Sequence, residues 1–528
     1  MTFRRNLELP LLISAVAASR FLFRSHLLYD LDSVNFALGM EHFDPRVLQP
    51  HSPGYFLYVC LGRLFQLAFR DANLALVVLS IAASCGTIAM IYRMALEWFG
   101  PNAARFAALL FLFSPLAWFH GTVALTYIVA AFFSSLLGYL CWRIALGETR
   151  WIWLAALVLG ISAGVRPSSL IFLAPLFLYA LWHAAAKERL AGALILLLAL
   201  AAWSVPMVWA SGGLHAYLAA FFSLWKMVPS KTTVFNSSPA NSIARACTIV
   251  LIYFLCFGAA SLAPLARLGR TSAVEPRRKV FTAIWIAPAL CFFTFIFLKF
   301  VNSGYLLVVL PPACIWLGLW TSEWYRDSWL PKRAKAAVVW IGAAANVLMF
   351  LFSPFYCSYR SVRQFEARMG AIQRALPHAG APGDTVIVSF DSHFLGFRHA
   401  GYYFPGYLTL EYPEAHLLEG TRIFSMQGGE TRLLTGLPSH PPSRFVLFPL
   451  PTGNQYQQYL KKVFDRLPPQ SLRMVRSGGY AFVTGPSSDL PLLFPPIKTG
   501  AKPGSVYGAS HRDPACKQPC TLALQKAP

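Results

Sequence analysis

The sequence predicts a polytopic α-helical membrane protein that carries an extracytoplasmic α/β domain near its C-terminal end. Of the 528 residues, 56% are hydrophobic and only 13% are charged, and the mean hydropathy is +0.51. A soluble domain carries about 25% charged residues. Apolar runs of about 17–25 residues recur through the first two thirds of the chain, and each can cross a hydrocarbon core of about 30 Å. The loops between these runs hold most of the basic residues.

We expect about eleven transmembrane helices within residues 1–356, each set by one apolar run. Their predicted starts lie near residues 8, 73, 102, 122, 151, 168, 190, 246, 281, 304 and 336. Basic clusters precede the first run and follow the fourth, sixth, eighth and tenth, so all fall on one side if the N-terminus is cytoplasmic. This pattern predicts an odd number of spans and an extracytoplasmic C-terminal region. We separately expect the protein in a bacterial inner (plasma) membrane.

The net charge of +23 has two interpretations. In a soluble protein it would favour a nucleic-acid partner. Here the basic residues lie between apolar runs, where they set topology and bind anionic headgroups. We therefore expect contacts with membrane lipid and no nucleic-acid partner.

The first external loop, residues 29–71, is the first candidate for a catalytic region. It contains the acidic pair Asp30 and Asp32, a polar stretch, and an apolar run from Tyr55 to Phe69. Gly62 and Arg63 interrupt that run, so we predict a helix that lies on the membrane surface rather than crossing it.

The C-terminal region divides into residues 357–486, a predicted α/β domain, and a Pro-, Gly- and Lys-rich tail from 487 to 528, which we expect to be disordered. Residues 383–390 have the pattern of a turn followed by a buried strand. Residues 444–448 and 480–483 predict two further strands. Residues 357–486 are enough chain for a small domain.

Asp30 and Asp32 are the strongest candidates for chemistry. A carboxylate at the mouth of a membrane bundle is costly and is usually retained for function. One of the two would act as a general base or as a metal ligand. The alternative is that Asp32 is simply the N-cap of the next helix.

His51 begins the segment His51-Ser52-Pro53-Gly54-Tyr55. Its imidazole could bind a phosphate, a sugar or, together with Asp32, a divalent metal; no other cofactor is predicted. Ser52 and Pro53 suit the N-cap and first turn of a helix whose amide groups would face an anion. The alternative is a segment that only turns the chain.

Arg166 and Lys299 are basic residues on the predicted external side, where the topology rule disfavours them. Either could hold a lipid-linked phosphate, and arginine can do so with two parallel hydrogen bonds. The alternative is that both side chains extend to the lipid headgroups.

The order of these motifs resembles the GT-C superfamily of polytopic glycosyltransferases over residues 10–320, and most closely its protein O-mannosyltransferase-like branch. Members of that branch carry a similar His-Pro-Pro-Gly-Tyr-Pro-Leu segment after an acidic first loop; here Ser52 and Phe56 replace two of its prolines. The ordered motifs are the acidic pair, residues 50–58, Leu61-Gly62-Arg63-Leu64-Phe65, Phe113-Ser114-Pro115-Leu116-Ala117-Trp118, Tyr127, Gly164-Val165-Arg166-Pro167 and Gly304-Tyr305-Leu306-Leu307.

The resemblance implies an enzyme that moves a sugar, mannose among the candidates, from a polyprenyl-phosphate carrier to a glycan, lipid or protein acceptor on the non-cytoplasmic face. It implies that Asp32 is the base or a metal ligand, with Asp30 as the alternate. For the donor phosphate we select Arg166, Lys299 and His51 by position. The tyrosines selected for substrate binding are Tyr55, Tyr127 and Tyr305.

Two other classes of function fit a polytopic chain. A lipid-linked sugar flippase or transporter would line a pathway with charges, but the apolar runs contain few acids and no matched pair of broken helices. A non-catalytic scaffold would present the C-terminal domain and would tolerate the loss of Asp32.

Overall fold

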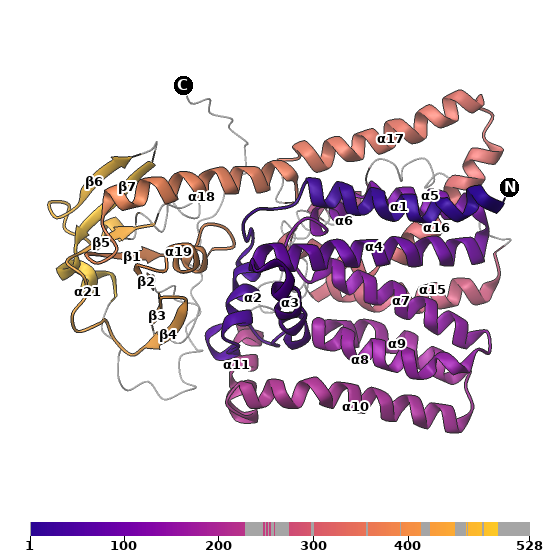
Figure 1. Cartoon of the computed structure of the whole chain (residues 1–528), viewed down its shortest axis with the longest axis horizontal. Coiled ribbons are helices and arrows are strands. Elements are labelled where there is room, and N and C mark those ends of the chain that lie inside the picture. The colour runs from indigo at the N-terminus through magenta and orange to yellow at the C-terminus, as the bar shows by residue number, and fades with distance from the viewer. Residues whose placement is uncertain are drawn as a thin grey trace, which may run out of the picture.

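The computed structural model describes residues 2–227, 274–296, 300–354, 357–390, 392–412, 423–448, 463–477 and 480–494, with a few single residues between 247 and 258 and at 461. Side-by-side helices form a bundle that ends in a layer of short crosswise helices, and a sheet domain lies beyond that layer (Figure 1). The predicted fold class, a helical membrane bundle with a C-terminal α/β domain, is confirmed.

The bundle is built from apolar helices that run back and forth along one axis (Figure 1). Short polar or glycine-containing turns connect several of them. The helices are α1 (Thr2–Leu22), α4 (Ala72–Phe99), α5 (Pro101–Leu112), α6 (Pro115–His120), α7 (Tyr127–Ala145), α8 (Ile152–Val165), α9 (Ser168–Trp182), α10 (Ala186–Ala210), α15 (Pro276–Cys291), α16 (Leu310–Asp327) and α17 (Lys332–Phe352).

Five of the described helices are long and apolar enough to cross a membrane: α4, α7, α10, α17 and the helical stretch Pro276–Ile296. Others are shorter; α5, with 12 residues, spans about 18 Å against a hydrocarbon core of about 30 Å. The predicted span near residue 246 lies largely outside the described residues. The count of about eleven spans therefore stays a prediction.

The loops at one end of the bundle carry the predicted basic clusters. The connections α7–α8, α9–α10 and α16–α17 all lie at the end that holds the N-terminus (Figure 1). The first external loop and the sheet domain lie at the opposite end. The arrangement agrees with the one-sided pattern in the sequence, and the cytoplasmic location of the N-terminal end stays a prediction.

Helices α2 (Leu31–Glu41) and α3 (Phe56–Phe69) run across the bundle end rather than along its axis (Figure 1). Leu64 and Leu67 of α3 are exposed, whereas its opposite face is buried against α2 and α4. Gly62 permits that approach, because a Cβ there would lie 2.7 Å from Met40 Sδ. The predicted helix is present and runs crosswise as α3 (Figure 1), and its place on the membrane surface stays a prediction.

The sheet domain contains seven described strands in the order β4-β3-β2-β1-β5-β7-β6. The central trio β2-β1-β5 is parallel and the flanking pairs are antiparallel. The strands are β1 (Thr385–Ser389), β2 (Leu408–Glu411), β3 (Ile423–Gln427), β4 (Glu430–Leu434), β5 (Arg444–Leu447), β6 (Arg473–Ser477) and β7 (Tyr480–Pro486). Helices α18 (Tyr359–Ala379) and α19 (Phe397–Tyr403) connect this sheet to the bundle.

The predicted strands over 383–390, 444–448 and 480–483 correspond to β1, β5 and β7. The prediction of disorder from residue 487 is wrong at its start. Residues 487–494 form a 3-10 turn and the short helix α21 (Leu490–Leu493), and Leu490 and Leu493 are fully buried in the sheet's core. The Pro-rich composition of this stretch predicted disorder, but these two leucines pack into the sheet domain and extend it to residue 494. Residues 495–528 lie outside the described residues.

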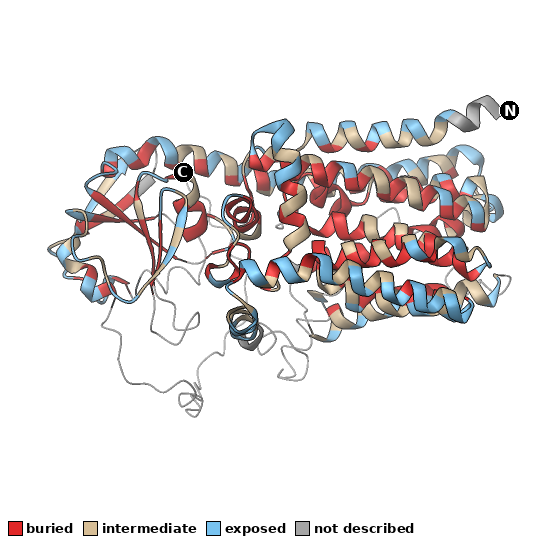
Figure 2. Cartoon of the chain, turned by 60° about the horizontal axis from the view of Figure 1, so that its bottom comes forward, coloured by how far each residue is buried: buried red, intermediate tan, exposed pale blue. Residues whose placement is uncertain are grey.

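One apolar core joins the sheet domain to the bundle end. Tyr29, which precedes the acidic pair, places its ring 5.4 Å from Phe365 of α18, 4.9 Å from Phe394, and 5.9 Å from Phe119 of α6. The burial colours continue through this junction in Figure 2. Because rings from both parts pack together, the sheet domain is fixed over the first external loop.

Candidate functional site

Asp30 and Asp32 occupy different places in α2. Asp30 is the N-cap: it is buried, its backbone is extended, and its Oδ1 accepts a hydrogen bond of 2.9 Å from the Asp32 amide. Asp32 lies in the first turn, and 32% of its side chain is exposed. The alternative of Asp32 as the N-cap is therefore wrong, because the helix begins one residue before it. Its carboxylate is left available to face the site.

His51 faces Asp32 across the loop. Its Nδ1 lies 3.3 Å from Asp32 Oδ1, and 19% of the side chain is exposed. The imidazole is held between aromatic rings, with centroids 5.0 Å from Tyr55 and 6.4 Å from Phe36 of α2. Two residues separated by nineteen positions in the chain thus form one acid–imidazole pair.

The predicted helix start at Ser52 and Pro53 is wrong. Gly54 and Tyr55 both have positive φ, 107° and 47°, and α3 begins only at Phe56, without a side-chain cap. These left-handed residues turn the chain before the helix can form. Gly54 is also needed for space, since a Cβ there would lie 2.7 Å from Met207 Sδ. The amide groups of the helix start therefore belong to Phe56 and the residues after it, and anion binding there stays a prediction.

Arg166 is the C-cap of α8 and is buried, with 4% of the residue exposed. Its Cζ lies 4.0 Å from the ring centroid of Tyr127, 4.3 Å from that of Tyr305 and 5.8 Å from that of Tyr55. Nη1 donates a short hydrogen bond to Thr126 Oγ1. The guanidinium is enclosed by rings, so the alternative of a side chain that extends to the headgroups is wrong for Arg166.

The charge of Arg166 lacks an acidic partner in the part of the chain that the structure describes: none of the ion pairs found there includes it. Contacts with ring faces stabilise a cation by roughly 0.5–2 kcal/mol each. A buried cation without a counter-ion is costly and, inside a membrane protein, typically marks a functional site. The pocket is therefore suited to an anionic ligand.

Gly304 lets the next residue, Tyr305, lie beside Arg166 as the third tyrosine of the site. A Cβ on Gly304 would lie 2.4 Å from Cγ of Tyr127, so only glycine allows the turn Phe300–Val308 to pack so closely on α7. The rings of Tyr127 and Tyr305 then meet edge to face at 5.6 Å. The selected tyrosines thus line one site around Arg166.

His120, at the end of α6, was not among the predicted site residues. It is fully buried, its ring centroid lies 5.0 Å from that of Tyr127, and neither ring nitrogen has a hydrogen-bond partner among the described residues. A buried polar group without a partner costs about 1–3 kcal/mol. The only sequence signal was a histidine within an apolar stretch, which is more often a core residue.

Two predictions about ligands have different outcomes. Lys299 lies outside the described residues, so its place relative to Arg166 stays a prediction. For a metal, Asp32 and His51 supply two neighbouring donors, and no group of three His, Cys, Asp or Glu side chains occurs in the described part of the chain. Two protein donors do not complete a structural metal site.

A model of the N-terminal domain of the protein O-mannosyl-transferase TMEM260 matches residues 46–189, from the turn Pro45–Val47 into α10. The fold is similar to ArnT from Cupriavidus metallidurans bound to undecaprenyl phosphate, a GT-C superfamily member, with a TM-score of 0.57 at 14% identity over 90% of this chain and 97% of that one. This chain has the GT-C glycosyltransferase fold. ArnT in the apo state aligns over the same shares, with a TM-score of 0.54.

An oligosaccharyltransferase from Archaeoglobus fulgidus, tethered with an acceptor peptide, has a TM-score of 0.47 at 14% identity over 78% of this chain and 64% of that one. A comparison with curated protein sequences found no match. The predicted GT-C fold is confirmed, and the family match over residues 46–189 agrees with the predicted glycosyltransferase activity. The matched family segment carries His51, Tyr55, His120, Tyr127 and Arg166.

Proposed function

We propose that this GT-C protein transfers a sugar from a polyprenyl-phosphate carrier to an acceptor at the external bundle end, with Asp32 as the base. The observation that carries the proposal is Arg166, a buried cation that three tyrosines enclose and no described carboxylate neutralises. The Asp32–His51 pair connects to it through the ring of Tyr55. A basic and an acidic group at one site are what transfer from a phosphate donor requires.

The donor phosphate would bind Arg166, whose guanidinium can give two parallel hydrogen bonds to its oxygens. The lipid tail would lie between bundle helices and leave the phosphate at the bilayer edge. In ArnT, which has the same fold, the bound molecule is undecaprenyl phosphate. His120, with both ring nitrogens free of described partners, would add a hydrogen bond to a phosphate or sugar oxygen. Lys299 is proposed as a second cation at this phosphate.

The reaction would be a displacement at the anomeric carbon. The acceptor oxygen forms a bond to that carbon, and the bond from the carbon to the phosphate oxygen breaks. The electron pair leaves with the phosphate, whose charge Arg166 stabilises. Asp32 takes the acceptor proton. With the base and the leaving group on opposite faces of the sugar, the product has inverted anomeric configuration.

His51 would hold the Asp32 carboxylate, because its Nδ1 is the group found 3.3 Å from Oδ1. Tyr55, Tyr127 and Tyr305 would enclose the donor at the Arg166 end. The match to an O-mannosyltransferase family model supports mannose as the first sugar to test. The acceptor is proposed as a glycan, lipid or protein on the external face of a bacterial inner membrane.

The rival classes predict different behaviour. A flippase would move the carrier across the bilayer without breaking the sugar–phosphate bond, and a scaffold would neither move nor cleave it. Neither a flippase nor a scaffold needs Asp32 to accept a proton, so replacing this residue would leave their function unchanged. Asp32 is partly exposed at the bundle end rather than along a transmembrane pathway.

The test is a transfer assay with purified protein in lipid nanodiscs, a panel of radiolabelled polyprenyl-phosphate sugars, and membrane extract as the acceptor source. We expect label transfer from one donor by the wild type and at least a 10²-fold loss in Asp32→Asn, as for removal of a positioned base. Glu41→Gln is the matched control, an exposed acid on the same helix. Equal transfer by Asp32→Asn and wild type would refute the assignment.

A further inference from the structure

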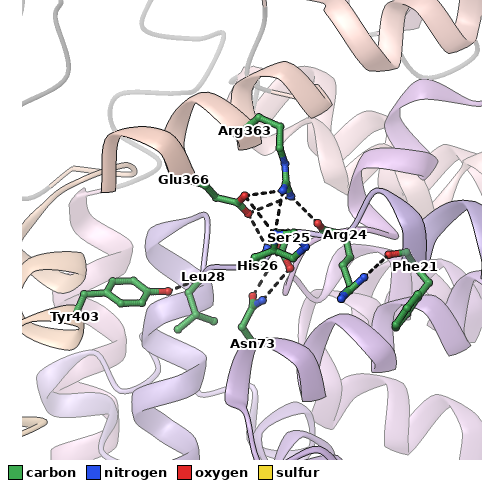
Figure 3. Close-up of polar contacts among 9 residues, drawn as sticks. All are labelled: Phe21, Arg24, Ser25, His26, Leu28, Asn73, Arg363, Glu366 and Tyr403. Carbon is green, nitrogen blue, oxygen red and sulfur yellow. Dashed lines mark hydrogen bonds and ion pairs between the residues drawn. The ribbon is translucent and has the colours of Figure 1, made fainter. Parts of the chain in front are cut away.

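The sheet domain holds the chain just before Asp32. Three backbone amides there donate hydrogen bonds to the C-terminal region, and Figure 3 shows the first two. The pairs are His26 to Glu366 Oε1 (2.6 Å), Leu28 to the Tyr403 hydroxyl (2.7 Å) and Leu31 to the His393 carbonyl (2.9 Å). These three amides donate outside any helix or strand ladder, and their hydrogen-bond partners are more than 330 residues away in the chain.

Helix α18 strengthens this attachment at the end of α1. Arg363 Nη2 donates to the Arg24 carbonyl at 2.6 Å, and Arg363 forms an ion pair of 2.8 Å with Glu366 (Figure 3). The Glu366 side chain is only 12% exposed, so solvent screens this pair less than an open surface pair. The position of the segment between α1 and α2 is therefore fixed relative to α18.

The same domain also holds the chain just before His51. Arg398 of α19 is buried; its Nη2 donates to the Val47 carbonyl at 2.5 Å, and its Nη1 donates to Thr431 Oγ1 of β4 at 2.9 Å. That hydroxyl also accepts a hydrogen bond of 3.0 Å from Gln49 Nε2. A buried arginine and a strand hydroxyl thus fix the loop two residues before His51.

Both members of the acid–imidazole pair follow a segment that the sheet domain anchors. Asp32 comes one residue after the Leu31 amide, and His51 comes two residues after Gln49. Their contact of 3.3 Å joins two separate parts of the first external loop, so it depends on the relative placement of both anchors. A displacement of 1 Å in a reacting group can lower a rate by about 10²-fold.

We propose that the sheet domain is the positioning element of the first external loop, and that Arg398 and Thr431 set the placement of His51 against Asp32. The inference rests on the proposed function and deepens it. Neither residue is catalytic: each acts on the reaction through the Val47–Gln49 backbone and side chain. The domain thereby has a role in the rate of transfer, separate from any contact with an acceptor.

The test uses the full-length protein in nanodiscs, with transfer measured against donor concentration. Arg398→Met keeps an unbranched apolar side chain and removes the guanidinium donors, and Thr431→Val removes only the hydroxyl. Arg432→Gln is the matched control, because Arg432 is the next residue of β4, on the opposite sheet face, with a side chain that is 73% exposed. We expect kcat to fall about 10- to 100-fold in Arg398→Met and several-fold in Thr431→Val, with the donor KM within twofold.

Each outcome decides the proposal. An unchanged kcat in both variants would overturn it. A raised donor KM at unchanged kcat would also overturn it, because that result would place these residues in donor binding. If Arg398→Met does not accumulate in the membrane, Thr431→Val decides alone, since it changes one hydroxyl. Absence of transfer by the wild type with every donor would instead contradict the proposed function.

Discussion

Arg166 is the residue on which the proposed function depends most, because its buried guanidinium is stabilised by ring faces and neighbouring hydroxyl groups, and no acid of the described residues pairs with it. The site around it combines residues that the ordered motifs predicted: Asp32, His51, Tyr55, Tyr127 and Tyr305. Arginine at this position offers a planar fork and a face that stacks on rings, neither of which lysine supplies.

Replacing Arg166 tests that distinction. In Arg166→Lys the charge is retained, but the fork and the stacking are lost, so we expect kcat/KM for the donor to fall about 10- to 100-fold. In Arg166→Gln the charge is lost too, and we expect a fall of about 10³-fold, the upper range for removing an electrostatic group from a transition state. Arg150→Gln, at the opposite bundle end with a side chain that is 73% exposed, is the control. Equal activity of the Lys and Gln variants would contradict a role for the charge.

His120 is expected to lower the stability of the fold while it contributes to transfer. His120→Phe keeps an aromatic ring and removes two buried nitrogens without described partners. We expect thermal unfolding to shift upward or stay unchanged, since such groups cost about 1–3 kcal/mol, while transfer falls more than about tenfold. A scan of unfolding temperature beside the transfer assay measures both. If the variant keeps full activity, His120 is only a core residue; His183→Phe, near the other end of the bundle, is the control.

The sequence could select Arg166 because a cation on the external side opposes the topology rule, and the resemblance to the GT-C superfamily selected the tyrosines that the structure places around it. It could not predict His120 or the conformation at Gly54-Tyr55. A histidine within an apolar helix carries no pattern, and a left-handed tyrosine is set by tertiary contacts rather than by local preference.

At the scale of elements, α2 is the helix that aims Asp32. Its N-cap, Asp30, satisfies an amide at the start of the helix and leaves the neighbouring carboxylate available. The two aspartates therefore occupy different positions in the helix, which the spacing in the sequence left open.

Substituting Asp30 separates helix capping from a role in the reaction. Asp30→Ser keeps a capping oxygen, and we expect near wild-type stability and most of the transfer activity. Asp30→Ala removes the cap, and we expect a loss of about 0.5–2 kcal/mol in the free energy of unfolding, with a smaller loss of transfer than in Asp32→Asn. Denaturation in detergent and the transfer assay measure the two effects. If Asp30→Ser is as inactive as Asp32→Asn, then Asp30 and not the cap alone serves the reaction.

Elements with a strong apolar pattern were the predictable ones. The buried strands β1, β5 and β7 and the crosswise helix α3 follow from runs of apolar residues, or from their interruption at Gly62-Arg63. The edge strands β4 and β6 mix polar and apolar residues on exposed faces, so alternation did not reveal them. Boundaries of the short bundle helices are set by packing with neighbours, which a hydropathy window does not register.

At the scale of the whole molecule, the sheet domain and the bundle end form one unit through a shared core and through the hydrogen bonds to the first external loop. His399 of α19 lies in this junction, fully buried against Phe365. Burial lowers the pKa of His399 from 6.5 to about 4, and the nearby His393 lowers it further when charged.

The His399 shift predicts acid sensitivity. Below about pH 6.5 the imidazole of His399 binds a proton in the unfolded chain, whereas in the folded chain it stays neutral until about pH 4. The free energy of unfolding is therefore unaffected by protonation of His399 above pH 6.5 and decreases as the pH falls from 6.5 to 4. The loss is on the order of 3 kcal/mol at pH 4. We expect the unfolding temperature of His399→Phe to depend less on pH between 6.5 and 4 than that of wild type or of His378→Gln, an exposed control on α18. Parallel pH curves for all three would contradict this.

In the proposed reaction, Arg166 binds the donor and Asp32 takes the proton, so the two functions can be measured separately. The most direct test is equilibrium binding of tritiated undecaprenyl phosphate to wild type, Asp32→Asn and Arg166→Gln in the same nanodiscs, together with transfer by each. We predict that Asp32→Asn binds the carrier within about threefold of wild type without transfer, and that Arg166→Gln loses at least about tenfold in affinity, as for a hydrogen-bonded charge. Wild-type carrier affinity in Arg166→Gln, or transfer by Asp32→Asn, would contradict the account.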